Sequence, residues 1–314
     1  MIARLFGALL ALALVLGMDF AVAANRWGAD YFPNVPLVTQ DGRTVRFYDD
    51  LLKGKSVVVN LIYTQCSSEC PLETAKLVQV QRLLGGRVGK DVFFYSISID
   101  PFDTPELLKA YAEKFGVGPG WLFLTGKEAD IALIGKKLGL SSLSDLADRD
   151  GHQPSLMIGN EPAGQWMRNS AVDNPRFLAT KIGMFLGSGN MPVTEPAKSY
   201  ALARPIEDLD PGGHLFSLRC SACHTIGEGD AVGPDLLGVT GRRDRAWLER
   251  YLAQPDKMLA ERDPIVKALF ARYRAVRMPN LHLGQGDVAA LLSYLEARSN
   301  AAQQRERKGA VLAR

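Results

Sequence analysis

Segments that have the pattern of buried strands alternate with helix-like segments in the first part of this chain. The apolar runs are KSVVVNLIY (55–63), DVFFYSISI (91–99) and WLFLT (121–125). Helix-like segments follow them at 71–84, 105–115 and 127–138. Such alternation builds βαβ units and therefore predicts a mostly parallel sheet.

A hairpin and one more helix complete this first domain. SLMIG and GQWMRN are separated by the turn sequence NEPAG and predict two antiparallel strands. Residues 175–186 then predict a last helix. We therefore expect an α/β domain over residues 30–187.

Strand signals are absent beyond residue 187. Residues 188–211 lack periodicity and are rich in Gly, Pro and charge, which predicts a linker. The segments 212–219, 245–253, 264–276 and 285–297 have helical patterns. We expect an all-α domain over 212–298 and a disordered tail over the polar, basic residues 299–314.

The N-terminal segment has the pattern of an export signal. It contains Arg4, an apolar run from Leu5 to Met18 and small residues up to Ala24, so we predict a signal peptide over 1–24. An uncleaved membrane anchor is the alternative. Either way the rest of the chain is expected in the periplasm or on the outer face of the inner membrane, where cysteine pairs can oxidise.

Composition bounds the class of protein. The chain has 314 residues, 47% of them hydrophobic and 23% charged, which is enough for two packed cores. Its formal net charge of +3 is too small and too scattered to indicate nucleic-acid binding.

The stretch CSACH contains a C-x-x-C-H motif. Cys220 and Cys223 have the spacing of thiols that bond covalently to haem, and His224 follows as the axial imidazole. This strong signal predicts a covalently bound haem c. A chance disulfide beside a histidine is the alternative.

The region around this motif resembles class I cytochromes c. CSACHTIGEGDAVGPDLLGVTGR is similar to their haem-attachment segment, and MPNLHLGQGDVAALLSYLEA to their axial methionine and last helix. The resemblance implies Met278 as the second axial ligand, with Met258 and His282 as alternatives. A His/Met iron passes electrons rather than activating oxygen.

The other two cysteines stand in YTQCSSECPLE. Pro71 is typical of a first helical residue, which predicts Cys70 at the N-cap of a helix and Cys66 in the loop before it. The positive end of the helix dipole favours thiolate there. If the residues between them curl into one turn, the pair can bind one metal ion or close a disulfide.

Two thiolates select Cu(I), and an imidazole as third ligand would also accommodate Cu(II). Of the four histidines only His152 lies in the first domain, at the entry to a strand. A lone histidine can equally be an ordinary loop residue, and residue patterns alone leave both interpretations open.

The first domain resembles the Sco/SenC family of copper proteins. The similarity covers roughly residues 30–187 and rests on three segments, VVVNLIYTQCSSECPLE, ISIDPFDTPELLKAYAEKFG and the histidine before SLMIG. It implies a thioredoxin-like fold and copper ligands Cys66, Cys70 and His152. It also implies a role in assembling the dinuclear copper centre of cytochrome c oxidase, with the copper-bearing oxidase subunit and other copper or redox carriers as partners.

Two positions depart from the family pattern. Gly151 stands where an Asp often precedes the histidine, and Pro154 is more typical of thiol-disulfide proteins. An exported thiol-disulfide oxidoreductase using Cys66 and Cys70 is therefore the alternative to a copper chaperone and electron-transfer protein. A redox sensor would be a third class, and a peroxiredoxin is disfavoured because Tyr63 and Val59 replace its Thr and Pro.

The acidic segment DPFDTPE is predicted to be structural rather than a metal site. Asp103 or Thr104 is expected to cap a helix whose first residue is Pro105.

Overall fold

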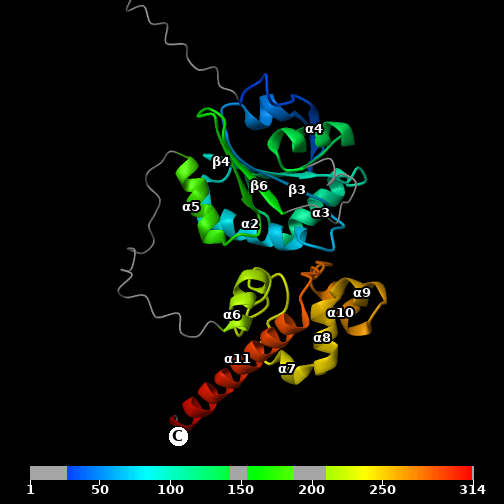
Figure 1. Ribbon diagram of the computed structural model, residues 1–314, viewed down its shortest axis with the longest axis vertical. Coiled ribbons are helices and arrows are strands. Elements are labelled where there is room, and N and C mark those ends of the chain that lie inside the picture. Colours follow the sequence, from blue (N-terminus) through cyan, green and yellow to red (C-terminus); the bar gives the residue numbers. More distant parts are fainter. Residues whose placement is uncertain (1–26, 142–153, 187–209, 313–314) are drawn as a thin grey trace, which may run out of the picture.

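The computed structural model describes residues 27–141, 154–186 and 210–312 (Figure 1). The predicted signal peptide, nearly all of the predicted linker and the candidate ligand His152 lie outside the described residues.

A seven-stranded sheet forms the first domain. Its strands are β1 (Pro36–Thr39), β2 (Thr44–Arg46), β3 (Ser56–Ile62), β4 (Val92–Ser98), β5 (Trp121–Thr125), β6 (Ser155–Asn160) and β7 (Gln165–Ser170). The order is β2-β1-β5-β4-β3-β6-β7. Strands β3, β4 and β5 pair in parallel, and β6 and β7 form the predicted hairpin, antiparallel to β3.

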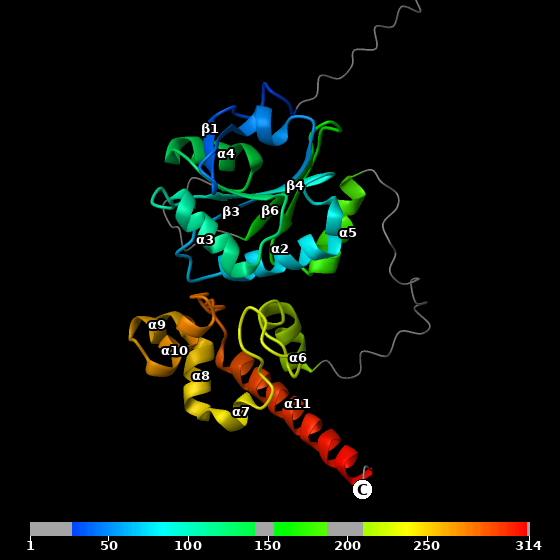
Figure 2. The ribbon, with the colours of Figure 1, turned by 180° about the vertical axis from the view of Figure 1, so that it is seen from behind.

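Helices cover both faces of this sheet (Figures 1 and 2). They are a π-helix (Phe47–Leu52), α2 (Cys70–Leu84), a short 3₁₀ turn (Gly85–Arg87), α3 (Pro105–Phe115), α4 (Glu128–Leu138) and α5 (Pro175–Phe185). Helices α2, α3 and α5 pack on one face, and α4 and the π-helix pack on the other. The expected α/β architecture is confirmed.

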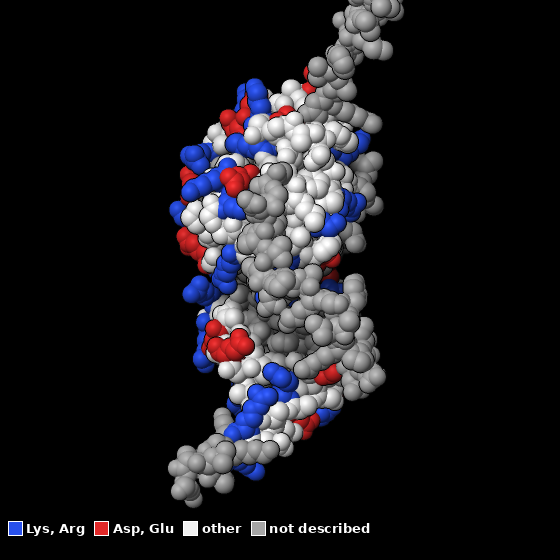
Figure 3. Space-filling view, turned by 90° about the vertical axis from the view of Figure 1, so that its left-hand side faces the viewer, with Lys and Arg blue, Asp and Glu red and all other residues white. Residues whose placement is uncertain are grey.

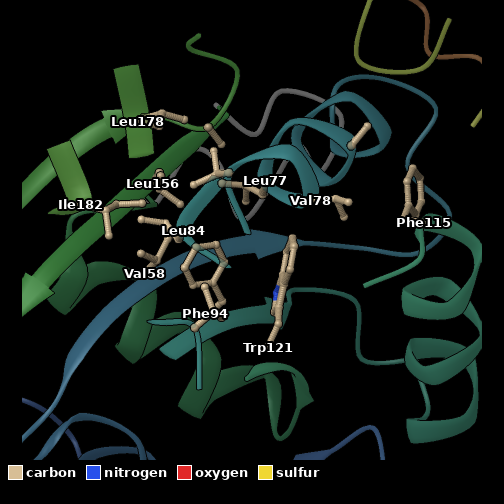
Figure 4. Packing of buried hydrophobic residues seen from close by; sticks show 14 of the residues in the cluster. Val58, Leu77, Val78, Leu84, Phe94, Phe115, Trp121, Leu156, Leu178 and Ile182 are labelled. Atoms are coloured by element: carbon tan, nitrogen blue, oxygen red, sulfur yellow. The ribbon is translucent and has the colours of Figure 1, made fainter. Parts of the chain in front are cut away.

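The central strand β3 is buried on both faces, which explains its continuous apolar sequence. Val58 and Ile62 belong to the cluster under α2, α3 and α5, whereas Val57, Val59 and Leu61 belong to the cluster under α4. Figure 4 shows the first cluster, in which Phe94 and Trp121 stand between the sheet and the helices. Their ring centroids are 5.4 Å apart in an edge-to-face arrangement.

The second domain is helical. Its elements are α6 (Pro211–Leu215), a π turn (Phe216–Cys220), α7 (Val239–Arg242), α8 (Arg245–Ala253), α9 (Pro255–Ala260), α10 (Pro264–Arg272) and α11 (Gln285–Leu312). Helix α6 packs closely against α11 because Gly212 has no side chain. A Cβ there would lie 2.1 Å from the carbonyl oxygen of Ala290.

Three sequence expectations need correction. Cys70 is the first residue of α2, and Glu69 rather than Cys70 occupies the N-cap position. The predicted helix over 264–276 ends at Arg272, where the chain turns. The tail expected to be disordered over 299–314 continues α11 to Leu312, because its Ala, Gln, Glu and Arg residues are good helix formers that extend an already packed helix.

Charges of both signs are interspersed on the face seen in Figure 3, and no extended field of one sign appears there. Within the described ranges, no helix has both the length and the apolar character required to cross a membrane.

Phe94 tests the importance of the cluster under α2. We expect Phe94→Ala to lower the free energy of unfolding of the α/β domain by about 3–5 kcal/mol, because it removes a fully buried ring. Phe102, which is 77% exposed, is the matched control, and Phe102→Ala should change stability by less than about 0.5 kcal/mol. Denaturant titration followed by circular dichroism measures both; equal losses would contradict this assignment of the core.

Candidate functional site

Residues 63–69, here called the cysteine loop, connect the end of β3 to the start of α2. Tyr63, Cys66 and Cys70 pack together in a small buried cluster, and Cys66 and Cys70 are only 4% and 1% exposed. Cys70 opens α2, so its thiol lies at the positive end of the helix dipole. The structure therefore brings the two predicted thiols together at the carboxyl end of the parallel strands.

The two thiols differ in acidity. The hydrogen bond from the Cys70 thiol is the main influence that lowers the pKa of Cys66 to about 7, and backbone N–H groups of Cys70 and Ser68 and the Tyr63 hydroxyl add to it. Burial raises the pKa of Cys70 well above that of an ordinary thiol, and the neighbouring Cys66 raises it further. The pair thus holds one thiolate and one proton near neutral pH.

Asp103 fixes the beginning of the cysteine loop. Its carboxylate accepts hydrogen bonds from the Thr64 backbone N–H at 2.9 Å, the Thr64 hydroxyl at 2.5 Å and the Ser98 hydroxyl at 2.5 Å. The side chain is 3% exposed. Sequence reasoning predicted a helix cap here, and Thr104 is indeed the cap of α3, accepting from the Leu107 N–H. The bracing role of Asp103 was not predicted.

A buried carboxyl lies one turn beyond Cys70. Glu73 is 1% exposed, and desolvation raises the pKa of Glu73 well above its usual range. One of its oxygens accepts from the Asn60 side-chain amide at 3.2 Å, whereas its Oε1 has no hydrogen-bond partner. Ser96 in turn donates to Asn60 and accepts from the Trp121 indole N–H. A polar chain therefore runs beneath the cysteines inside the core.

His152 is the third predicted copper ligand, and its position lies outside the described residues. Pro154, two residues further along the chain, precedes β6, whose Leu156 pairs with Asn60 of β3. Because β6 is antiparallel to β3, the start of β6 lies beside the end of β3, where the cysteine loop begins. Among the described residues no group of three or more His, Cys, Asp and Glu side chains could hold a metal ion.

In the helical domain the predicted haem residues gather around one apolar cavity. Cys220, Cys223, His224 and Met278 all contribute to its lining. His224 is held by a 2.9 Å hydrogen bond between its Nδ1 and the carbonyl oxygen of Pro234. With Nδ1 donating to a carbonyl, Nε2 is free to bind iron, as in other haem sites with a proximal histidine.

Packing around the imidazole is equally restrictive. A Cβ on Gly233 would lie 2.6 Å from Cε1 of His224, so only glycine fits beside the ring. Burial lowers the pKa of His224, which keeps the ring neutral and able to bind a metal. Burial also raises the pKa of both Cys220 and Cys223 to about 12. The residues present fit a covalently bound haem.

The structure separates the three candidates for the second axial ligand. Met278 lines the cavity, whereas Met258 and His282 are not among the lining residues. Met258 is completely buried within α9, as expected for a side chain that fills the core. That Met278 binds the iron stays a prediction. Of the three candidates, Met278 is the one that lines the cavity.

The acidity of Cys66 gives a prediction about pH. Cys66 should lose its proton as pH rises through about 7, whereas an ordinary thiol requires a pH above about 8. In Cys70→Ala the main hydrogen bond is removed, so the pKa of Cys66 should rise. NMR of isotope-labelled cysteine Cβ carbons in reduced protein measures this, with Ser68→Ala as control because only its backbone contributes. A Cys66 midpoint that is the same in wild type and Cys70→Ala would contradict the prediction.

Comparison with known families agrees with this division of the chain. The SCO1/SenC family model matches residues 26–153, and the cytochrome c family model matches residues 209–299. The SCO1 protein homolog of Bacillus subtilis is 36% identical over 89 residues, which are 28% of this chain and 45% of that protein. The chain thus spans less than half the length of this curated relative.

Solved structures of both kinds are similar to parts of the chain. The crystal structure of yeast Sco1 with copper bound is 24% identical, with a TM-score of 0.40, and covers 51% of this chain and 95% of its own. The cytochrome c domain of the pp3183 protein from Pseudomonas putida is 49% identical, with a TM-score of 0.28, and covers 29% of this chain and 91% of its own.

The expected α/β and all-α fold classes are confirmed, with a mixed sheet covered by helices in the first domain and a helical second domain. The first part of the chain therefore matches the SCO1/SenC family model, and the part that follows matches the cytochrome c family model.

Proposed function

We propose that this protein binds copper outside the cytoplasm through Cys66, Cys70 and His152 and assists assembly of the dinuclear copper centre of cytochrome c oxidase. Its recipient would be the copper-bearing oxidase subunit. The observation that carries the proposal is the pair of buried, mutually hydrogen-bonded thiols at the start of α2, one of which has a lowered pKa. Two sulfur ligands in an apolar setting favour Cu(I).

The chain's own residues prepare this site for a soft cation. The Cys66 thiolate is stabilised before metal arrives, so binding requires only the Cys70 proton to leave. Two hydrogen bonds from Thr64 to Asp103 hold the start of the loop, and one from Ser98 holds Asp103 itself. Cys66 is thereby kept beside Cys70 at the start of α2. His152 would be the neutral third ligand, two residues before Pro154 at the start of β6.

The second domain would hold haem c through Cys220 and Cys223, with His224 and Met278 as axial ligands. A haem with these ligands supplies one-electron transfer. Mostly apolar side chains of the domain line the cavity, and the Pro234 carbonyl orients His224. Localisation in the periplasm or on the outer face of the inner membrane is part of this proposal and rests on the signal peptide predicted from the N-terminal sequence.

The asymmetry between the two thiols favours a second candidate function. A cysteine with a lowered pKa beside one that keeps its proton is also the arrangement of an attacking thiolate and its resolving partner. An exported thiol-disulfide oxidoreductase would use Cys66 and Cys70 in this way and would not require His152.

Copper titration separates the two functions. Under anaerobic conditions wild type should bind one copper per chain, Cys66→Ala should lose Cu(I), and His152→Ala should retain Cu(I) but lose Cu(II), because imidazole is the ligand that accommodates Cu(II). His214→Ala is the control, since His214 is exposed on α6. If wild type binds copper weakly while Cys66 and Cys70 still exchange with a dithiol, the oxidoreductase function replaces the proposal.

The haem assignment has its own test. Met278→Leu should abolish the absorption band of methionine-to-iron charge transfer in ferric protein and lower the haem potential, because the thioether ligand is lost. Met258→Leu is the matched control, because Met258 is buried away from the cavity lining. Visible spectroscopy and redox titration measure both variants. Loss of the band in Met258→Leu alone would assign the ligand to Met258 instead.

A further inference from the structure

The two candidate sites of this chain meet at one interface. The segment 274–282, here called the methionine loop because it carries Met278, lies against the cysteine loop in both ribbon views (Figures 1 and 2). The backbone N–H of Asn280 donates to the carbonyl oxygen of Ser67 at 2.9 Å. The Arg277 guanidinium donates to the side-chain oxygen of Gln65, also at 2.9 Å. Arg277 and Asn280, on either side of Met278, therefore bond to the two residues next to Cys66.

A third contact joins the two cysteine motifs. The Arg219 guanidinium forms an ion pair with Glu69 at 3.1 Å. Arg219 precedes Cys220, and Glu69 precedes Cys70. Both side chains are partly shielded from water, being 37% and 26% exposed, so the pair is less screened than a fully exposed one.

Apolar contacts accompany these polar ones. Four partly buried side chains of the second domain, Ala222, Cys223, Val232 and Val276, pack against the core cluster that contains α2. Helix α2 itself lies between the sheet and the second domain (Figures 1 and 2). Residues 70–78 of this helix are all buried, including Lys76 at 3% exposed. This first part of the helix therefore has partners on every side.

One layer of side chains separates the two sites. A cavity of about 90 Å³ lies beside Cys66 and is walled on the far side by Phe270, Val276 and Arg277. The same three residues line the cavity around His224 and Met278. The surface that covers Cys66 is therefore also a wall of the predicted haem pocket.

The methionine loop is held in a conformation that an isolated loop would avoid. Arg274, Ala275 and His282 have φ angles of 55°, 56° and 52°, in the left-handed region that side chains other than glycine rarely adopt. Such conformations persist where surrounding contacts fix them. The contacts with the cysteine loop supply part of that constraint.

We propose that the cytochrome c domain is an internal docking partner of the cysteine loop, which covers Cys66 and occupies the surface that an external copper donor or recipient would contact. The proposal rests on the function proposed above for the cysteine pair. Separation of the domains would expose Cys66 for transfer, and renewed docking would return it to the wall of the haem pocket. The chain thus has a covered state and an open state, and Arg219 and Glu69 are specificity contacts of the covered state.

Paramagnetic NMR of the haem-loaded, copper-free full chain tests this docking. Ferric haem shifts the resonances of nearby nuclei, so the amides of 65–69 should move between ferric and ferrous protein. Arg219→Glu places two carboxylates together and should reduce these shifts, and combining it with Glu69→Arg should restore them. Arg245→Glu is the control, because Arg245 pairs with Glu249 in its own helix. Absence of the shifts in wild type, or shifts that Arg219→Glu leaves unchanged, would overturn the proposal.

A second measurement addresses the covering of Cys66. Arg219→Glu should raise the rate of Cys66 alkylation about twofold to fivefold, the effect of losing one partly exposed ion pair. The new negative charge alone would slow the reaction by disfavouring thiolate, so a faster rate indicates exposure. The haem spectrum is recorded first, so that failure of the docking proposal can be told apart from failure of the proposed function. A chain that lacks haem contradicts the proposed cytochrome function. A haem-loaded chain that shows no docking contradicts only the docking proposal.

Discussion

Burial of β3 on both faces is the constraint on which the cysteine site depends. With apolar side chains directed alternately to the two clusters, a shift of one residue would move Val58 and Ile62 into the wrong layer, so the register against β4 and β6 is fixed. The strand therefore ends at a defined place, and the cysteine loop starts there. Asp103, which follows the parallel strand β4, reaches the same edge and holds Thr64.

Burial raises the pKa of both thiols, and hydrogen bonds to Cys66 lower the pKa of Cys66, so the local geometry decides which thiol ionises first. Cys66 receives hydrogen bonds from a thiol, a hydroxyl and two backbone N–H groups, and these outweigh its burial. Cys70 is more deeply buried and beside an existing thiolate, so it keeps its proton. The position of Cys70 at the start of α2 would by itself favour thiolate there, but burial and the neighbouring Cys66 outweigh the helix dipole and raise the pKa of Cys70.

Elements with local signals could be predicted closely from the sequence. Proline at the first turn and Thr104 as cap define α3, and its predicted bounds of 105–115 equal those observed. The role of Asp103 could not be predicted, because its partner Thr64 lies 39 residues away in the chain. The C-x-x-C-H motif located Cys220, Cys223 and His224 by spacing alone. The strained methionine loop and its contacts with Gln65 and Ser67 depend on packing between domains, which periodicity does not encode.

Because the two domains belong to one chain, weaker contacts are sufficient to hold them together than two separate proteins would require. The polar contacts of this interface, an ion pair and two hydrogen bonds each worth about 1 kcal/mol or less, are joined by only a few partly buried apolar side chains. The polar contacts alone would scarcely associate two separate proteins against the loss of translational and rotational freedom. A covalent connection replaces that cost by an effective concentration on the order of millimolar. Contacts of this strength then favour the covered state while leaving it easy to open. A tighter interface would keep Cys66 covered permanently, whereas the proposed exchange of copper with another protein requires the weaker one.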